Sequence, residues 1–325
     1  MAAIFVALTP MATAQRGDLR IAVFGDFNGP YGATEYPRLV RVALDLVLGE
    51  WQPDLLLSPG DVIAGQSRAL QPADLDAMWQ AFDRDIASRS SAAGVPFAVA
   101  LGNHDASSLR NRDGSFQFQA DRDAAVRYWD ADDQGLEHIV AHDYPFNYAF
   151  AHGGAFVIVI DASSARLSEG QDAWALEQLG STDAREAGVR VMVGHLPLLP
   201  IARGRDTPGE YLAEGQALAR AWSEAGLDLY VSGHQAAFYA GTVNALETLF
   251  AGGVGGKVLL AGEAPARSTV TLVDIWFEPL VIEYTTVDLV TREALVVGDL
   301  PPRIVSEAGA VELTTSTLRL HPPAP

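Results

Sequence analysis

The sequence contains no cysteine among its 325 residues. This absence excludes disulfide bonds, thiolate metal ligands and a cysteine nucleophile. It does not indicate a compartment, because a protein without disulfides can work in any of them. Any catalytic or metal-binding chemistry must therefore come from other side chains.

Basic residues are scarce: 22 lysines and arginines stand against 41 aspartates and glutamates, which gives a net charge of -19. An acidic surface repels nucleic-acid phosphates, so the composition argues against a broad nucleic-acid-binding role. The same field slows anionic substrates unless bound cations make the binding site locally positive. We interpret most of the charge as a solvated surface.

Long apolar runs are also missing, because no segment reaches the ~18 to 20 apolar residues that a membrane-spanning helix needs. Two features of a secretory signal are present: an apolar run at residues 2–8, and the small residues Ala12, Thr13 and Ala14. The basic residues that begin such a signal are missing, since no lysine or arginine precedes Arg16. We expect residues 1–15 to be a signal or other N-terminal segment and the protein to be periplasmic or secreted, with a cytoplasmic location as the alternative.

What is present is a globular composition, 49% hydrophobic and 19% charged, which suffices to bury a large core. Apolar runs of strand length alternate with segments of helical period, which indicates an α/β sheet with helical crossovers. The expected strands are residues 19–24, 54–57, 96–100, 156–160, 189–193 and 227–231, and the expected helices are residues 36–50, 72–88, 121–129, 171–179 and 210–224.

The pattern changes after about residue 236, where helical segments become rare. Residues 246–250, 270–276 and 280–286 resemble consecutive, mostly antiparallel strands. Residues 300–325 are rich in proline, threonine and serine, and we expect an edge strand followed by a loose tail. Since no linker or internal repeat interrupts the chain, we expect one domain over residues 18–300 and a C-terminal tail over residues 301–325.

Polar residues beside glycines follow nearly every strand of the first series. The carboxyl ends of strands in α/β sheets are where ligand sites assemble, and glycine lets the backbone turn sharply there. One such element is typical of an ordinary turn. Five in order predict a site with oxygen and imidazole ligands, a mix that suits Mn, Fe, Zn or Mg. The elements are Gly25-Asp26-Phe27-Asn28, Gly60-Asp61, Gly102-Asn103-His104-Asp105, Gly194-His195 and Gly233-His234.

This order and spacing resemble the calcineurin-like metallophosphoesterases, whose pattern is D-x-H, G-D, G-N-H-[DE], a later His, and G-H-x-H. The resemblance spans residues 20–241 and is most specific at Gly102-Asn103-His104-Asp105. It implies an α/β fold, a sandwich of two mixed β-sheets flanked by helices. It also implies a hydrolase that uses one or two divalent metal ions per chain to cleave a small phosphorylated substrate, as a phosphatase or a phosphodiesterase.

The resemblance also assigns metal ligands. It implies that Asp61 bridges two ions, that Asp26 belongs to the first metal site, and that Asn103, His195 and His234 complete the second. Two such cations lie roughly 3.5 to 4 Å apart, activate a bound water and clamp the phosphoryl oxygens during in-line attack. No protein nucleophile is needed for this chemistry.

Two further roles follow from the same motif and its neighbours. The resemblance implies that His104 lies near the phosphate and protonates the leaving oxygen, with Asp105 orienting it, and that Asn103 also meets the substrate. Tyr31, in the loop after the first motif, and Arg110, after the third, are candidate substrate-binding residues, since arginine favours phosphate. An ordinary turn with an exposed aromatic, or a surface arginine, is the alternative for these two.

Two ligands of the family pattern are missing, and both belong to the first metal site. Asn28 occupies the position of the D-x-H histidine, and Ala236 that of the second histidine of G-H-x-H. An asparagine carbonyl still binds metal, whereas alanine cannot, and Gln235 is a poor substitute because adjacent strand residues point to opposite faces. The protein is therefore a dinuclear enzyme with a weak first site, a mononuclear hydrolase, or a catalytically impaired binding protein with one metal site.

Overall fold

A computed structural model describes residues 16–130, 135–136 and 140–314 of the chain. The predicted N-terminal segment, residues 1–15, and the last residues of the predicted tail, 315–325, lie outside the described residues. The strands are β1 Leu19–Val23, β2 Leu55–Ser58, β3 Phe97–Val99, β4 Val140–Asp143, β5 Asn147–His152, β6 Ala155–Val159, β7 Val189–Val193, β8 Leu229–Ser232, β9 Phe238–Val243, β10 Leu246–Ala251, β11 Thr269–Phe277, β12 Leu280–Asp288, β13 Arg303–Ser306 and β14 Gly309–Leu313.

Helices connect many of these strands, and none in the described residues is long and apolar enough to cross a membrane. The α-helices are α1 Arg38–Leu44, α2 Pro72–Phe82, α3 Ser88–Ala92, α4 Asn103–Ala106, α5 Gln119–Trp129, α6 Gln171–Leu179, α7 Thr182–Glu186 and α8 Gly215–Glu224. The π-helices are η1 Asp45–Trp51 and η2 Asp83–Ala87, and the 3-10 helix is η3 Val297–Asp299.

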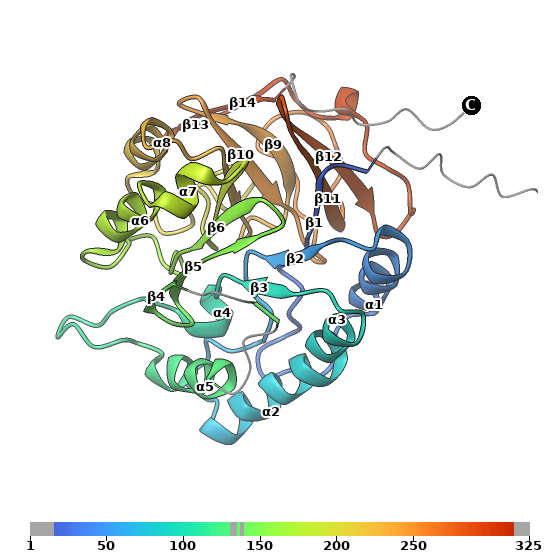
Figure 1. Cartoon of the computed structure of the whole chain (residues 1–325). Coiled ribbons are helices and arrows are strands. Elements are labelled where there is room, and N and C mark those ends of the chain that lie inside the picture. Colours follow the sequence, from blue (N-terminus) through green and yellow to red (C-terminus); the bar gives the residue numbers. More distant parts are fainter. Residues whose placement is uncertain (1–15, 131–134, 137–139, 315–325) are drawn as a thin grey trace, which may run out of the picture.

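Two mixed sheets form the middle of the molecule (Figure 1). The five-stranded sheet has the order β12-β11-β1-β2-β3, and the nine-stranded sheet has the order β13-β14-β9-β10-β8-β7-β6-β5-β4. Strands β1, β2 and β3 run parallel, as do β6, β7, β8 and β10, while the remaining pairs are antiparallel. The expected α/β sandwich of two mixed sheets flanked by helices is confirmed.

Alternate side chains of β1 pack on opposite sides of their sheet, because successive strand residues point to opposite faces. Leu19, Ile21 and Val23 belong to the core between the sheets, together with residues of β5 to β8. Ala22 belongs to a second core, formed with α1, α2 and α5. On the outer face of the nine-stranded sheet, Trp222 of α8 and residues of α6 join the first core, so helices cover both outer faces (Figure 1).

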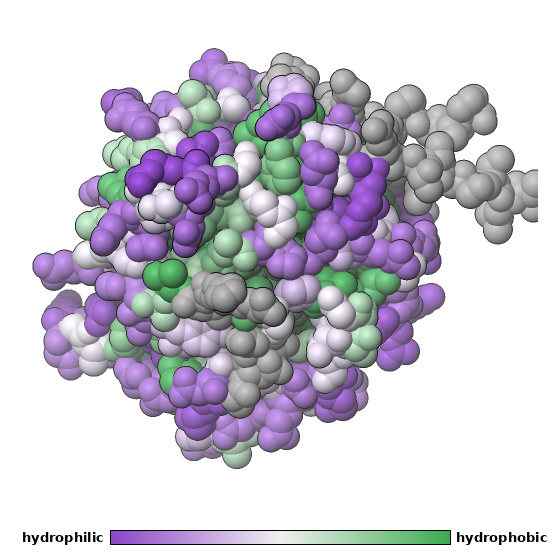
Figure 2. Space-filling model, in the orientation of Figure 1, coloured by the Kyte–Doolittle hydropathy of each residue, from purple (hydrophilic) through white to green (hydrophobic). Residues whose placement is uncertain are grey.

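The hydropathy of the surface agrees with a charged exterior. Hydrophilic side chains cover most of the face in Figure 2, with smaller apolar areas between them. This distribution is what we expect when most of the net charge of -19 lies on a solvated surface.

Most element boundaries lie within a few residues of the prediction, with some informative exceptions. The expected helix over residues 210–224 begins only at Gly215, because residues 210–214 form a loop in which Glu210 bonds His234. The antiparallel strands after residue 236 are divided between the two sheets, β9 and β10 in one and β11 and β12 in the other. Strands β13 and β14 extend the larger sheet beyond residue 300, into the segment expected to hold an edge strand and a tail.

Candidate metal centre

Five loops carry the candidate site, and each follows the carboxyl end of a strand. The loops after β1, β2 and β3 belong to the smaller sheet, and the loops after β7 and β8 belong to the larger one. Because the strands within each set are parallel, their carboxyl ends lie at one edge. The packing of the two sheets therefore brings together residues more than 200 positions apart.

Asp61 is buried in the loop after β2 and has a left-handed backbone, with φ of 56°. Such a conformation is strained for a residue other than glycine and is typical of functional sites. The carboxylate oxygen Oδ1 accepts a hydrogen bond of 2.9 Å from the backbone N–H of His104. A Cβ on Gly102 would lie 2.2 Å from that oxygen, so only glycine allows this approach.

The fully buried Asp105 holds the loop of Asp61 rather than the ring of His104. Its carboxylate accepts hydrogen bonds of 2.7 to 2.8 Å from the backbone N–H groups of Asp61, Val62, Ile63 and Gly102. Burial and the nearby charge of Asp61 raise the pKa of Asp105 to about 6, although these amides lower it. We expected Asp105 to orient His104. Its carboxylate bonds these backbone groups instead, because adjacent residues of a helix project in different directions.

His195 is buried and held in one orientation. Its Nδ1 lies 2.7 Å from the carbonyl oxygen of Pro59, which only accepts, so Nδ1 carries the proton of this hydrogen bond. The other ring nitrogen, Nε2, faces the site, 2.9 Å from Oδ1 of Asn103 and 3.4 Å from Oδ1 of Asp61.

His234 presents its opposite ring nitrogen. Nε2 lies 2.8 Å from a carboxylate oxygen of Glu210, and donating its proton there leaves Nδ1 as a lone pair. Nδ1 lies 2.9 Å from Oδ1 of Asn103 and 3.2 Å from Nε2 of His195. Arg205 forms an ion pair of 2.6 Å with the same Glu210 oxygen, and its Nη1 also lies 3.1 Å from Nε2 of His234.

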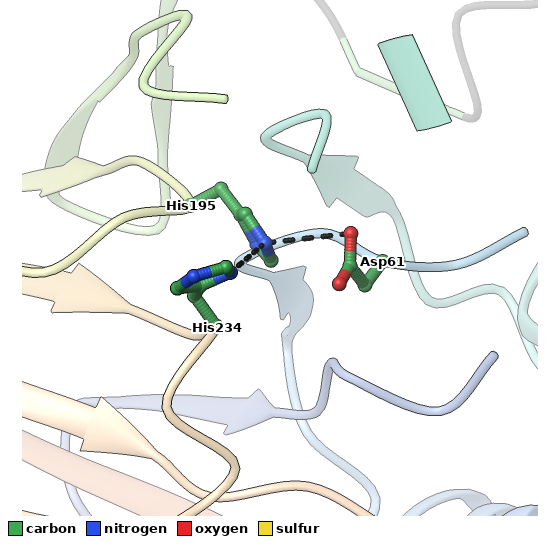
Figure 3. Close-up of side chains that lie close together, drawn as sticks. All are labelled: Asp61, His195 and His234. Carbon is green, nitrogen blue, oxygen red and sulfur yellow. Dashed lines mark hydrogen bonds and ion pairs between the residues drawn. The ribbon is translucent and has the colours of Figure 1, made fainter. Parts of the chain in front are cut away.

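The donor atoms fit a single cation. Asp61, His195 and His234 offer ligand atoms that all lie within 4.8 Å of one another (Figure 3). Oδ1 of Asn103 lies within 2.9 Å of both imidazole nitrogens. Four acceptor atoms facing one another repel unless a proton or a cation lies between them. Two imidazoles, a carboxylate and an amide oxygen suit Zn, Fe or Mn.

The pKa values of the cluster reflect burial and the charges of neighbouring side chains. Burial lowers the pKa of His195. The charge and the hydrogen bond of Asp61 outweigh this effect and raise the pKa to about 9. Burial and the charge of His195 lower the pKa of His234 to about 4, against a hydrogen bond to Glu210. Burial raises the pKa of Asp61, yet His195 holds it well below its ordinary value. These shifts favour an ion pair between His195 and Asp61, whose Nε2 and Oδ1 atoms lie 3.4 Å apart.

The first metal site that the family pattern implies has fewer ligand side chains than the second. Asp26 has φ of 50° and accepts the backbone N–H of His234 at 3.0 Å, and its burial raises its pKa to about 8. The backbone N–H of Asn28 lies 3.2 Å from the carbonyl oxygen of Asp61, so Asn28 lies beside the loop that follows β2. Ala236 has no donor side chain. Gln235 does not replace it, because its Oε1 accepts the N–H groups of residues 201 and 202.

The candidate substrate-binding residues lie in different settings. Tyr31 is 63% exposed, and its ring centroid lies 5.2 Å from that of His104, which places both at the rim. Nδ1 of His104 lies 3.3 Å from the carbonyl oxygen of Gly65. Arg110 is exposed and folds back on its own loop, where it bonds the carbonyl oxygen of Gly114 at 2.6 Å and covers the ring of Phe116.

Two residues of the site were not predicted. Glu210 bonds His234, and Gln66 bonds the amide nitrogen of Asn103 at 2.6 Å. Both lie in loops with no motif around them. Nothing in their sequence distinguishes them from other polar loop residues.

Comparison with known proteins agrees with this geometry. The family model of the calcineurin-like phosphoesterases matches residues 19–238. No curated protein matches the chain. Among solved structures, the purple acid phosphatase PPD1 from yellow lupin (Lupinus luteus) seeds is 15% identical with a TM-score of 0.55, and the alignment covers 85% of this chain and 52% of that one. This chain thus spans about half the length of the lupin phosphatase.

Two further structures have the same fold. GAP50, described as the anchor in the inner membrane complex of Plasmodium, is 16% identical with a TM-score of 0.52, over 92% of this chain and 90% of that one. A dimetal phosphatase from Danio rerio is 14% identical with a TM-score of 0.52, over 84% of this chain and 99% of that one. The family model covers most of the chain and contains all five motif loops, so this chain belongs to the calcineurin-like phosphoesterase family.

Proposed function

We propose that the protein is a metal-dependent phosphoester hydrolase acting on a small phosphomonoester or phosphodiester. The observation that carries this proposal is the convergence of four side chains. Ligand atoms of Asp61, His195 and His234 lie within 4.8 Å of one another, and Oδ1 of Asn103 lies 2.9 Å from both imidazole nitrogens. These residues would hold a divalent cation, which would lower the pKa of a bound water and stabilise negative charge on phosphoryl oxygens. The family and its phosphatase neighbours support a hydrolase.

The chain's own residues supply the remaining functions in this proposal. His104 lies at the rim, where the carbonyl oxygen of Gly65 accepts from Nδ1. A His104 ring that also carries a proton on Nε2 would give that proton to the leaving oxygen and keep the proton on Nδ1. Tyr31 packs beside that ring and offers an exposed aromatic surface to the substrate. The local positive charge of a bound cation offsets the net charge of -19 that otherwise repels an anionic substrate.

The test is hydrolysis of chromogenic phosphomonoesters and phosphodiesters by metal-depleted protein titrated with Mn²⁺. We expect turnover that rises with the metal and is lost in Asn103→Ala, because this variant removes a ligand oxygen. Asn111→Ala, on an exposed loop, is the control and should retain the activity. The preferred ester then separates phosphatase from phosphodiesterase. Metal-independent turnover, or equal turnover in Asn103→Ala, contradicts the proposal.

A second candidate function is a metal-binding protein without turnover, and the position of Ala236 favours it. This residue brings no donor to the first metal position, and the neighbouring Gln235 side chain points away from it. GAP50, a neighbour with the same fold, is described as the anchor in the inner membrane complex of Plasmodium. If the natural protein binds Mn²⁺ but shows no turnover, and Asn28→His combined with Ala236→His creates it, this second function holds.

A further inference from the structure

The side-chain amide of Asn103 has two unlike ends, and only its oxygen can bind a metal. In the structure the oxygen is the end that faces the site, 2.9 Å from both Nε2 of His195 and Nδ1 of His234. A rotation of the amide by 180° would turn its NH₂ group toward these nitrogens and remove one ligand. The orientation of this amide therefore decides whether the site has four donors or three.

Gln66 contacts the other end of the amide. Its Oε1 accepts a hydrogen bond of 2.6 Å from Nδ2 of Asn103. With the amide of Gln66 in the orientation that the structure shows, rotation of the Asn103 amide would set two oxygens against each other at this distance, and neither could donate. The acceptor on Gln66 thus favours the orientation in which Asn103 presents oxygen to the site.

The backbone of Gln66 is itself held in an uncommon conformation. Its φ is 63°, in the left-handed region that disfavours a residue with a side chain. The buried carboxylate of Asp121, on α5, accepts the N–H of Gln66 at 2.7 Å. A Cβ on the preceding Gly65 would lie 2.6 Å from that carboxylate and 2.4 Å from the carbonyl oxygen of His104, so the segment fits tightly.

The same two-residue segment reaches both functional residues of the third motif. Gln66 bonds Asn103, and the carbonyl of Gly65 bonds the ring of His104 at 3.3 Å. We propose that Gln66, held by Asp121, is a positioning residue that keeps the oxygen of Asn103 turned toward the metal. This inference rests on the proposed metal site.

The test measures metal affinity, by calorimetric titration of metal-depleted protein with Zn²⁺ and Mn²⁺. Gln66→Leu removes the acceptor at similar size, and we expect it to bind about tenfold more weakly, which is typical when a partner of a metal ligand is lost. Gln66→Glu keeps an acceptor and should bind no more weakly than wild type. Gln117→Leu is the matched control. This half-buried glutamine bonds the carbonyl of Arg110 at 3.1 Å and accepts from Arg68, two residues beyond Gln66, so its loss should not change the affinity.

A double-mutant cycle separates the effect of Gln66 on the orientation of the Asn103 amide from a general disturbance of the metal site. Asn103→Asp places two equivalent oxygens at this position, so it needs no orienting partner. We expect Gln66→Leu to weaken binding in the Asn103 protein but not in the Asn103→Asp background. Equal loss in both backgrounds, or no loss in either, overturns the proposal. Absence of metal binding by wild type instead refutes the proposed function, and thermal melting identifies a variant that has failed to fold.

Discussion

Nδ1 of His234 and Nε2 of His195 lie 3.2 Å apart, each held by a hydrogen bond at the far side of its ring. Pro59 fixes the tautomer of His195, and Glu210 fixes that of His234. The two rings therefore direct different nitrogen atoms at the same point. Because the loops after two neighbouring strands carry them, this convergence is a property of the sheet and not of either loop alone.

Metal binding should release a proton and weaken as the pH falls. Below pH 9 the proton on His195 must leave before a cation can bind, since Asp61 raises the pKa of that imidazole to about 9. His234, with a pKa of about 4, is already neutral and releases none. We expect the affinity for Zn²⁺ to fall about tenfold per pH unit below 9. Calorimetry in buffers of different ionisation enthalpy measures the released protons, and pH-independent affinity contradicts this assignment.

The hydrogen bond from His234 to Glu210 should support the metal site. Glu210→Ala removes the acceptor that fixes the tautomer, and we expect a 10- to 100-fold loss of metal affinity. The carboxylate keeps its charge at neutral pH because the His234 hydrogen bond lowers the pKa of Glu210 to about 2, against partial burial. Glu214→Ala, at an exposed position four residues further along, provides the control for loss of a negative charge. Equal affinity of both variants would show that the hydrogen bond is unimportant.

Asp105 should matter for stability more than for proton transfer. Asp105→Asn replaces one oxygen with an NH₂ group that faces backbone donors, and we expect a loss of about 2 to 4 kcal/mol in the free energy of unfolding. Urea unfolding measures this loss. Asp113→Asn, which changes an exposed carboxylate bonded to Ser115, should keep a midpoint close to wild type. If Asp105→Asn is as stable as wild type, the four backbone hydrogen bonds do not hold this loop.

Gly102 should tolerate no side chain. A Cβ there would lie 2.2 Å from Oδ1 of Asp61 and 2.4 Å from its backbone nitrogen, so Gly102→Ala must displace the metal ligand. We expect a destabilisation of about 1 to 3 kcal/mol, as for overpacking, together with loss of metal binding. Gly49→Ala is the matched control, because a Cβ at Gly49, in η1, meets nothing within 4 Å. Unchanged metal affinity in Gly102→Ala contradicts the prediction.

The sequence by itself determined the α/β fold and the loops that carry the site. Apolar runs and helical periodicity are local properties, so they predicted β7 and α6 at their observed boundaries. The glycine-flanked Asp61 and His195 were predicted because the carboxyl end of a parallel strand constrains where its next residues lie. The tertiary structure places them, with His234, within 4.8 Å of one another.

Only the tertiary structure decided which groups surround these ligands. Asp105 bonds the loop of Asp61, Glu210 bonds His234, and Gln66 bonds Asn103. Each of these contacts joins residues 24 to 44 positions apart, and the hydrogen bond from His195 to Pro59 spans 136. Such pairs depend on how strands are ordered and on how two sheets pack. Local periodicity contains no information about either, because many loop residues of the same type satisfy the same local pattern.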